Sequence, residues 1–138
     1  MKGGYSDDHL EALRSIDLPR EPSPSFLEIP PFGARWTRLG LTDADLHVLQ
    51  NMILATPSAG VVAPGTNGLR KLRFAVPGSR RGKSGSYRVL YLNVPTHGLV
   101  ALWAVLDKTE STNFTKAERG MLAARAAAFL AALDQRSR

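Results

Sequence analysis

The part of the sequence that decides the fold is a run of three strand-like segments, LRKLRFA (69–75), SYRVLYLN (86–93) and LVALWAVL (99–106). The third segment is almost entirely apolar, which is typical of a central strand that is covered on both faces. Short links separate the segments, and strands joined by short links usually pair in antiparallel fashion. These segments therefore predict an antiparallel sheet as the centre of the fold.

The first two segments alternate between apolar and polar side chains. In the first, Leu72 and Phe74 share one face, and Lys71 and Arg73 share the other. In the second, the two tyrosines are expected to point to the core, on the face opposite to Arg88. The pattern predicts a sheet with one apolar face and one basic face.

Helices are expected on both sides of these strands along the chain. One begins after Thr42, whose hydroxyl can cap the first turn, and stops before Pro57. Another begins after Thr115, where the run TKAE fits a reciprocal capping box. A short strand is predicted at 26–29, before two prolines. Together these elements predict a small α+β fold, an antiparallel sheet with helices packed against it.

The domain organisation follows from the charge. Residues 1–25 are predicted to form an acidic, peripheral N-terminal extension, and residues 26–138 a single domain. Residues 1–30 hold six acidic side chains against three basic ones, although the whole chain has a net charge of +6. One interpretation is that the extension folds over the basic surface, but a plain terminal tail is the favoured interpretation.

Several classes of protein are disfavoured by composition. The chain has no cysteine, so it contains no disulfide framework and no thiolate metal site. No apolar segment is long enough to span a bilayer, and the N-terminus lacks the apolar core of a signal peptide, which favours a soluble cytoplasmic protein. The spacing of His9, His47 and His97 does not suit a metal site, and no nucleotide-binding loop is present, so we expect no metal and no cofactor.

Basic residues gather in a part of the chain that has no acidic ones. No Asp or Glu occurs between Asp45 and Asp107, and seven cations lie in this interval. Cations without a local counter-charge repel one another unless an external anion neutralises them. A nucleic-acid backbone is the commonest such anion. A basic face kept only for solubility is the alternative, although such faces usually mix both signs of charge.

The cations on the strands suggest a chemistry. Arginines can hold a phosphodiester in bidentate fashion and stabilise a pentacovalent transition state, while a lysine among them can act as a general base. Attack by the ribose 2′-hydroxyl on the adjacent phosphorus would then need no metal and would be specific for RNA. The predicted catalytic residues are Lys71, Arg73, Arg88 and Lys108. The predicted RNA-binding residues are Arg70, Arg80, Arg81 and Lys83.

Three stretches of the sequence resemble a known family. They are the run PGTNGLRKLR (64–73), the run RGKSGSYRVLY (81–91) and the lysine at position 108 that follows the last strand. These stretches, in this order, are similar to the RelE/HigB superfamily of type II toxins, and in particular to its HigB-like, phage-Gp49-related branch. The resemblance covers roughly residues 26–133.

The resemblance implies a RelE-like fold and a ribosome-dependent endoribonuclease, an mRNA interferase that inhibits translation. It also implies mRNA on the ribosome as the substrate and a cognate helix-turn-helix antitoxin of the HigA type as the partner. The sequence departs from the family pattern at Asn67, Ser86 and Asp107, and Asp107 places an acid beside the predicted site. Two alternatives stay open: a non-catalytic nucleic-acid-binding module, and a toxin that inhibits gyrase through protein contacts.

Overall fold

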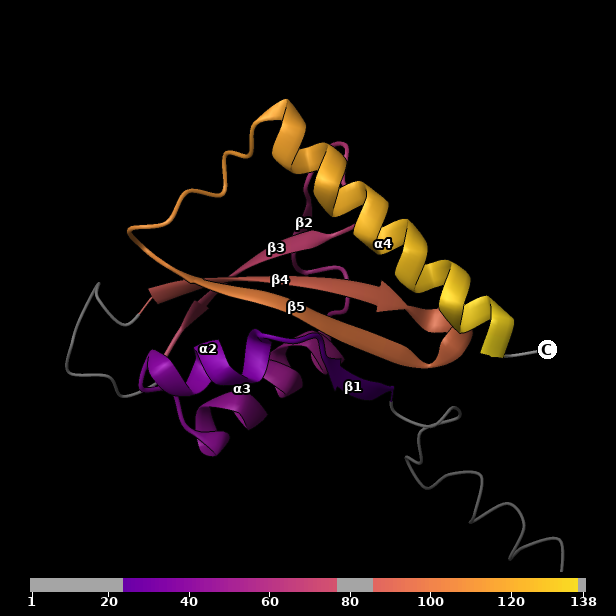
Figure 1. The fold of residues 1–138 in the computed structure, drawn as a ribbon. Coiled ribbons are helices and arrows are strands. Elements are labelled where there is room, and N and C mark those ends of the chain that lie inside the picture. Colours follow the sequence, from indigo (N-terminus) through magenta and orange to yellow (C-terminus); the bar gives the residue numbers. More distant parts are fainter. Residues whose placement is uncertain (1–23, 77–85, 137–138) are drawn as a thin grey trace, which may run out of the picture.

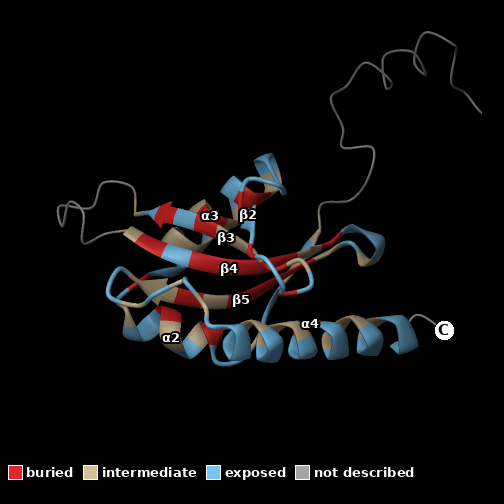
Figure 2. Cartoon of the chain, turned by 90° about the horizontal axis from the view of Figure 1, so that it is seen from above, coloured by how far each residue is buried: buried red, intermediate tan, exposed pale blue. Residues whose placement is uncertain are grey.

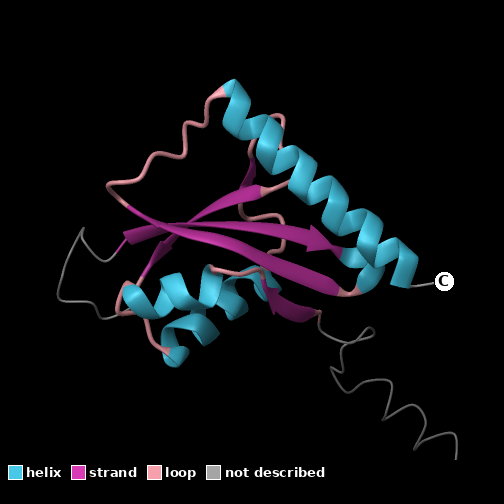
Figure 3. Ribbon diagram, viewed as in Figure 1, coloured by secondary structure: helices cyan, strands magenta, loops and turns pink. Residues whose placement is uncertain are grey.

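The fold is an α+β arrangement in which helices cover both faces of one sheet. The computed structural model describes residues 24–76 and 86–136. Helices α2 and α3 lie on one face of the sheet and α4 lies on the other (Figure 1 and Figure 3). In chain order the elements are β1 (Ser25–Glu28), α2 (Phe32–Arg38), α3 (Asp43–Ala55), β2 (Val61–Val62), β3 (Arg70–Ala75), β4 (Ser86–Val94), a 3₁₀ turn (Pro95–His97), β5 (Leu99–Asp107) and α4 (Lys116–Arg136).

The sheet is mixed, with the strand order β1-β5-β4-β3-β2. The three predicted strands are confirmed as β3, β4 and β5, which pair in antiparallel fashion. The predicted antiparallel sheet is confirmed for β2 to β5, but the prediction does not hold for β1, which pairs in parallel with the first half of β5, from Ser25 opposite Leu99 to Glu28 opposite Leu102. Antiparallel pairing is the rule for strands joined by short links, and β1 and β5 are separated by most of the domain.

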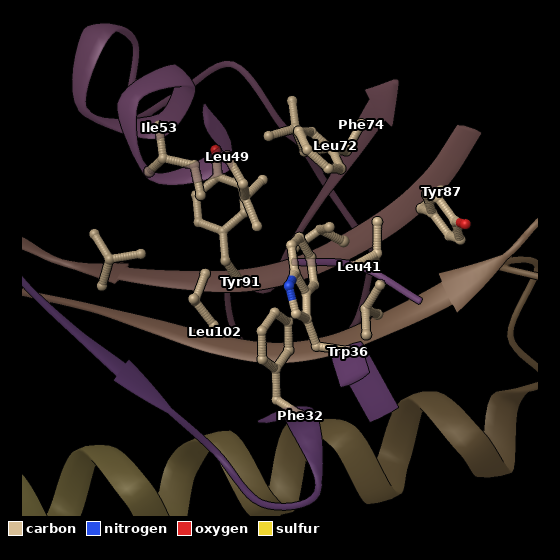
Figure 4. Close-up of a cluster of buried hydrophobic side chains, with 13 residues drawn as sticks. Phe32, Trp36, Leu41, Leu49, Ile53, Leu72, Phe74, Tyr87, Tyr91 and Leu102 are labelled. Atoms are coloured by element: carbon tan, nitrogen blue, oxygen red, sulfur yellow. The ribbon is translucent and has the colours of Figure 1, made fainter. Parts of the chain in front are cut away.

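The face covered by α2 and α3 holds the larger apolar core. Phe32 and Trp36 of α2 are buried, and Trp36 stacks on Phe32 and on Phe74 at centroid distances of 5.6 and 5.8 Å (Figure 4). Helix α2 was not predicted. It has no side-chain cap at its start, so it is held in place mainly by this aromatic packing, in which each buried ring contributes about 1.5–3 kcal/mol.

Helix α3 begins and ends where the sequence predicts. Thr42 accepts a hydrogen bond from the Asp45 amide, and the Asp45 carboxylate accepts one from the Thr42 amide, which completes a capping box. The loop after α3 is tied to the sheet by Tyr91, whose buried hydroxyl donates to the Pro57 carbonyl and accepts from the Gly60 amide. The predicted core orientation of Tyr87 and Tyr91 is confirmed by their burial.

Helix α4 packs against the opposite face. Trp103 of β5 meets Phe129 of α4 edge-on at 5.7 Å, beside a smaller apolar cluster. The predicted capping box is confirmed between Thr115 and Glu118. The helix contacts the sheet along one side only, and its outer side is exposed (Figure 2). Helix α4 therefore leaves part of this face uncovered, where β3 and β5 end and β4 begins (Figure 1).

Candidate functional site

The uncovered part of the α4 face carries two arginines that lie side by side. Arg73 of β3 is paired in register with Arg88 of β4, and both side chains are exposed. Residues paired in this way point to the same face and hold their Cβ atoms about 5 Å apart. Like charges in such a pair repel each other, so the arrangement favours a bound anion. The hydroxyl of Ser86 accepts a hydrogen bond from Arg73 at 3.3 Å.

A cavity of about 300 Å³ opens beside the two arginines. Three of the four predicted catalytic residues line it, because Lys108 joins Arg73 and Arg88 from the end of β5. The strands fix the two arginines and the turn after β5 fixes the lysine, so the cations approach the cavity from three segments of the chain. The full lining is Arg73, Ser86, Tyr87, Arg88, Asp107, Lys108, Glu110 and Thr112.

A β-bulge in β5 determines that the lysine, and not the neighbouring acid, is aligned with the arginines. Leu90 of β4 pairs with Ala104, but Tyr91 pairs with Leu102, so Trp103 is the extra residue. After the bulge Asp107 lies opposite Tyr87, on the face of α2 and α3. With strict alternation Asp107 would share the face of Trp103, and Lys108 would point away from it.

The acidic side chains near the cavity are held by hydrogen bonds and by an arginine from the other face. Arg35 of α2 donates to the Glu110 carboxylate and lies 3.9 Å from that of Asp107. Glu110 also accepts from the Asp107 amide at 3.1 Å, and Asp107 accepts from the hydroxyl and amide of Thr109 at 2.5 and 2.9 Å. Asp107, at which the sequence departs from the RelE/HigB pattern, is therefore partly neutralised by Arg35.

These contacts favour the ionised form of the Asp107 carboxyl. The pKa of its carboxyl lies below the usual value, chiefly because of the hydrogen bond from the Thr109 hydroxyl, then because of the one from the Thr109 amide, and also through the charge of Arg35. Desolvation opposes this shift. The same hydrogen bonds shape the turn that carries Lys108, so the turn is built around a charged carboxylate.

The fourth predicted catalytic residue lines an adjoining cavity. Lys71 lies two residues before Arg73 on β3, on the same face, and pairs with Leu90. Its cavity has a volume of about 250 Å³ and shares Thr112 with the first one. Arg119 of α4 lies in this second cavity. Sequence reasoning did not find Arg119, because α4 carries several cations and the sequence does not show which of them lies next to the sheet.

The predicted RNA-binding residues divide into two groups. Arg70 alternates with Lys71, so it lies on the face of α2 and α3, where its guanidinium donates to the Gly60 carbonyl at 2.7 Å and to that of Ser58 at 3.4 Å. It is therefore not part of the basic surface. The predictions for Arg80, Arg81 and Lys83, and those for nearly all of residues 1–25, lie outside the described residues.

Other classes of site find no support in residues 24–76 and 86–136. No group of three or more metal-binding side chains occurs there. His97 contacts Asp134 at 3.0 Å. No helix of this part of the chain is long and apolar enough to cross a membrane. No protein-family model matches the sequence.

Proposed function

We propose that this chain is the toxin of a type II toxin–antitoxin pair, a RelE/HigB-like endoribonuclease that cleaves mRNA on the ribosome without a metal. The observation that carries the proposal is the convergence of Arg73, Arg88 and Lys108 on one cavity. A phosphodiester gains negative charge in the transition state of its cleavage, and a cluster of cations is expected to stabilise that charge. The proposal includes a cytoplasmic location and a cognate helix-turn-helix antitoxin of the HigA type.

In the proposed reaction the 2′-hydroxyl oxygen of one ribose attacks the adjacent phosphorus. A bond forms between the 2′-oxygen and phosphorus, and the bond from phosphorus to the 5′-oxygen of the next nucleotide breaks. The products are a 2′,3′-cyclic phosphate and a free 5′-hydroxyl. One proton leaves the 2′-hydroxyl and one proton reaches the departing 5′-oxygen, so the step is balanced without a cofactor.

The residues of the cavity have distinct roles in this proposal. Arg73 and Arg88 bind the non-bridging phosphate oxygens, on which negative charge grows in the transition state. Lys108 lies in the same cavity and is the candidate donor of a proton to the 5′-oxygen. Lys71, in the adjoining cavity, binds the strand beside the reacting phosphodiester, and the proton of the 2′-hydroxyl passes to water.

Mapping of transcript 5′ ends after expression of the chain tests the proposal. We expect cuts within translated mRNA that carry 5′-hydroxyl ends, and far fewer cuts in Arg88→Gln. A control variant, Arg38→Gln, changes an exposed cation on the opposite side of the sheet and is expected to cut as the wild type does.

Two other outcomes would point to the alternatives. RNA binding without any cleavage would indicate a non-catalytic binding module. Intact mRNA together with gyrase-dependent DNA damage would indicate a gyrase inhibitor. Either outcome contradicts the proposed reaction.

A further inference from the structure

The second cavity has a composition that suits a nucleotide. It is lined by Lys71 and Arg119, by the half-buried ring of Phe114 and by the exposed side chain of Asn113. Cations recognise phosphate, an amide can bond to a base edge, and an aromatic or apolar wall accepts the flat surface of a base. Ala63, Pro64 and Thr112 complete the lining.

Arg119 is positioned before any ligand arrives. One terminal nitrogen donates to the Phe114 carbonyl at 2.8 Å. The aliphatic stem of the side chain runs over Gly65, where an added Cβ would lie 3.6 Å from the Arg119 Cδ atom. Gly65 and Gly68 have positive φ, as does Asn67, whose amide donates to the Ala123 carbonyl of α4 at 2.8 Å. The loop that contains Gly65, Asn67 and Gly68 is therefore bonded to α4, and these contacts hold the Arg119 side chain in place.

The charges of this cavity are not compensated by neighbouring acids. Within the described part of the chain, neither Lys71 nor Arg119 forms an ion pair, and the carboxylates of Asp107 and Glu110 are engaged by Arg35. The Nε and second terminal nitrogen of Arg119 have no hydrogen bond to another described residue. They remain available to phosphate oxygens.

The two cavities are spaced for successive phosphates of one strand. Lys71 and Arg73 are two residues apart on β3, which places their Cα atoms about 7 Å apart along the strand. Successive phosphates of an extended single strand have a comparable separation. Thr112 borders both cavities, so the two lie next to each other.

We infer that the cavity of Lys71 and Arg119 is a second phosphate subsite, which binds the phosphodiester next to the one held by Arg73 and Arg88. This inference rests on the proposed function and names its substrate more closely. The ligand is a single strand with at least two consecutive phosphodiesters, so a trinucleotide is the smallest one that fills both sites.

Binding of short, non-cleavable 2′-O-methyl oligonucleotides to the full chain tests the inference without requiring catalysis. The wild type is expected to bind a trinucleotide about tenfold more tightly than a dinucleotide, because one additional hydrogen bond to a charged group increases the affinity by about that factor. Arg119→Gln is expected to remove most of this difference and to leave dinucleotide binding unchanged. The salt dependence of trinucleotide binding should also fall by about 0.7 in log–log slope.

Three further variants serve as controls. Arg125→Gln changes an exposed cation of the same helix and is expected to bind both oligonucleotides as the wild type does. Arg88→Gln is expected to weaken both. Lys71→Gln removes the other cation of the cavity and is expected to reproduce Arg119→Gln, which separates a lost contact from a disturbed helix α4.

Equal trinucleotide affinity in Arg119→Gln, Lys71→Gln and the wild type would overturn the inference, even if mRNA cleavage is observed. Conversely, absence of cleavage together with a trinucleotide preference that depends on both residues would sink the proposed reaction and support the subsite.

Discussion

The two faces of the sheet are built from the same strands but are used differently. On β3, Leu72 and Phe74 enter the core under α2 and α3, while Lys71 and Arg73 point to the side of α4. The first face is closed by stacked aromatic rings, and the second is closed where α4 packs on the apolar cluster around Trp103. Stability should therefore depend mainly on the first face, and phosphate chemistry on the open part of the second. Substitutions on the two faces should separate these properties.

The largest effect on stability is expected from the closed face. Phe74→Ala removes a fully buried ring that stacks on Trp36, and the expected loss in the free energy of unfolding is about 3–5 kcal/mol. Chemical denaturation followed by circular dichroism measures this loss. Ala75→Ser, a change at the exposed neighbouring position, should alter the unfolding free energy by less than about 0.5 kcal/mol. Similar values for the two variants would contradict the assignment of the core.

The largest effect on activity is expected from the open face. Arg88→Gln should lower the rate of mRNA cleavage by about 10²–10³-fold, because removal of one hydrogen-bond donor to a charged transition state has an effect of this size in other enzymes. Its unfolding free energy should stay within about 0.5 kcal/mol of the wild type, because the side chain is exposed. Single-turnover cleavage and denaturation on the same preparation check both statements. A parallel loss of stability would show that the two faces are not separable.

The sequence was informative about the elements whose signals are local. The alternation in β3 and β4, the capping residues Thr42 and Thr115 and the basic face were all read correctly from neighbouring residues. Helix α2 was missed because seven residues without a cap give no local signal, and its stability comes from contact with Phe74.

The parts of the site that were missed depend on tertiary contacts. The bulge at Trp103 shifts the alternation of β5, and an apolar run shows no such shift in its pattern. Arg70 was included in the basic surface on proximity in sequence alone, although alternation places it opposite Lys71. Arg119 reaches the cavity of Lys71 only when α4 has packed against the loop that contains Gly65. Sequence patterns reveal which side chains share a strand face, but the pairing of distant elements decides which cavity they enter.

A smaller effect is expected at Arg35 of α2, which contacts the carboxylates beside the cavity of Arg88. Arg35→Ala removes the cation that holds Glu110 and lies near Asp107, and it leaves two unpaired carboxylates beside the cavity of Arg88. Affinity for single-stranded RNA should fall by about three- to tenfold, through repulsion of phosphate. Fluorescence anisotropy measures the loss, with Arg38→Ala as the control on the same helix.

The cause of that loss can be tested by charge compensation. Adding Glu110→Gln to Arg35→Ala removes one of the two carboxylates and should regain part of the lost affinity. If the double variant binds no better than Arg35→Ala, repulsion is not the reason, and Arg35 acts only through the shape of the turn.

The smallest effect is a dependence of stability on pH. The folded pKa of Asp107 is lowered, so its contribution to stability is fully present above the unfolded pKa of about 3.9 and is lost as the pH falls through the folded value. Thr109→Val removes the main hydrogen bond and should lower the melting temperature at pH 7 by more than it does at about pH 2. An equal difference at both pH values would rule out the charged carboxylate as the cause.

The most direct measurement of the difference between the two faces is an NMR titration of the full chain with a non-cleavable trinucleotide. The largest amide shifts are expected at Arg73, Arg88 and Lys108, with further shifts around Arg119, and none along α3. Shifts that cluster on α2 and α3, or that are spread evenly over the surface, would contradict the assignment of the open face as the phosphate-binding site.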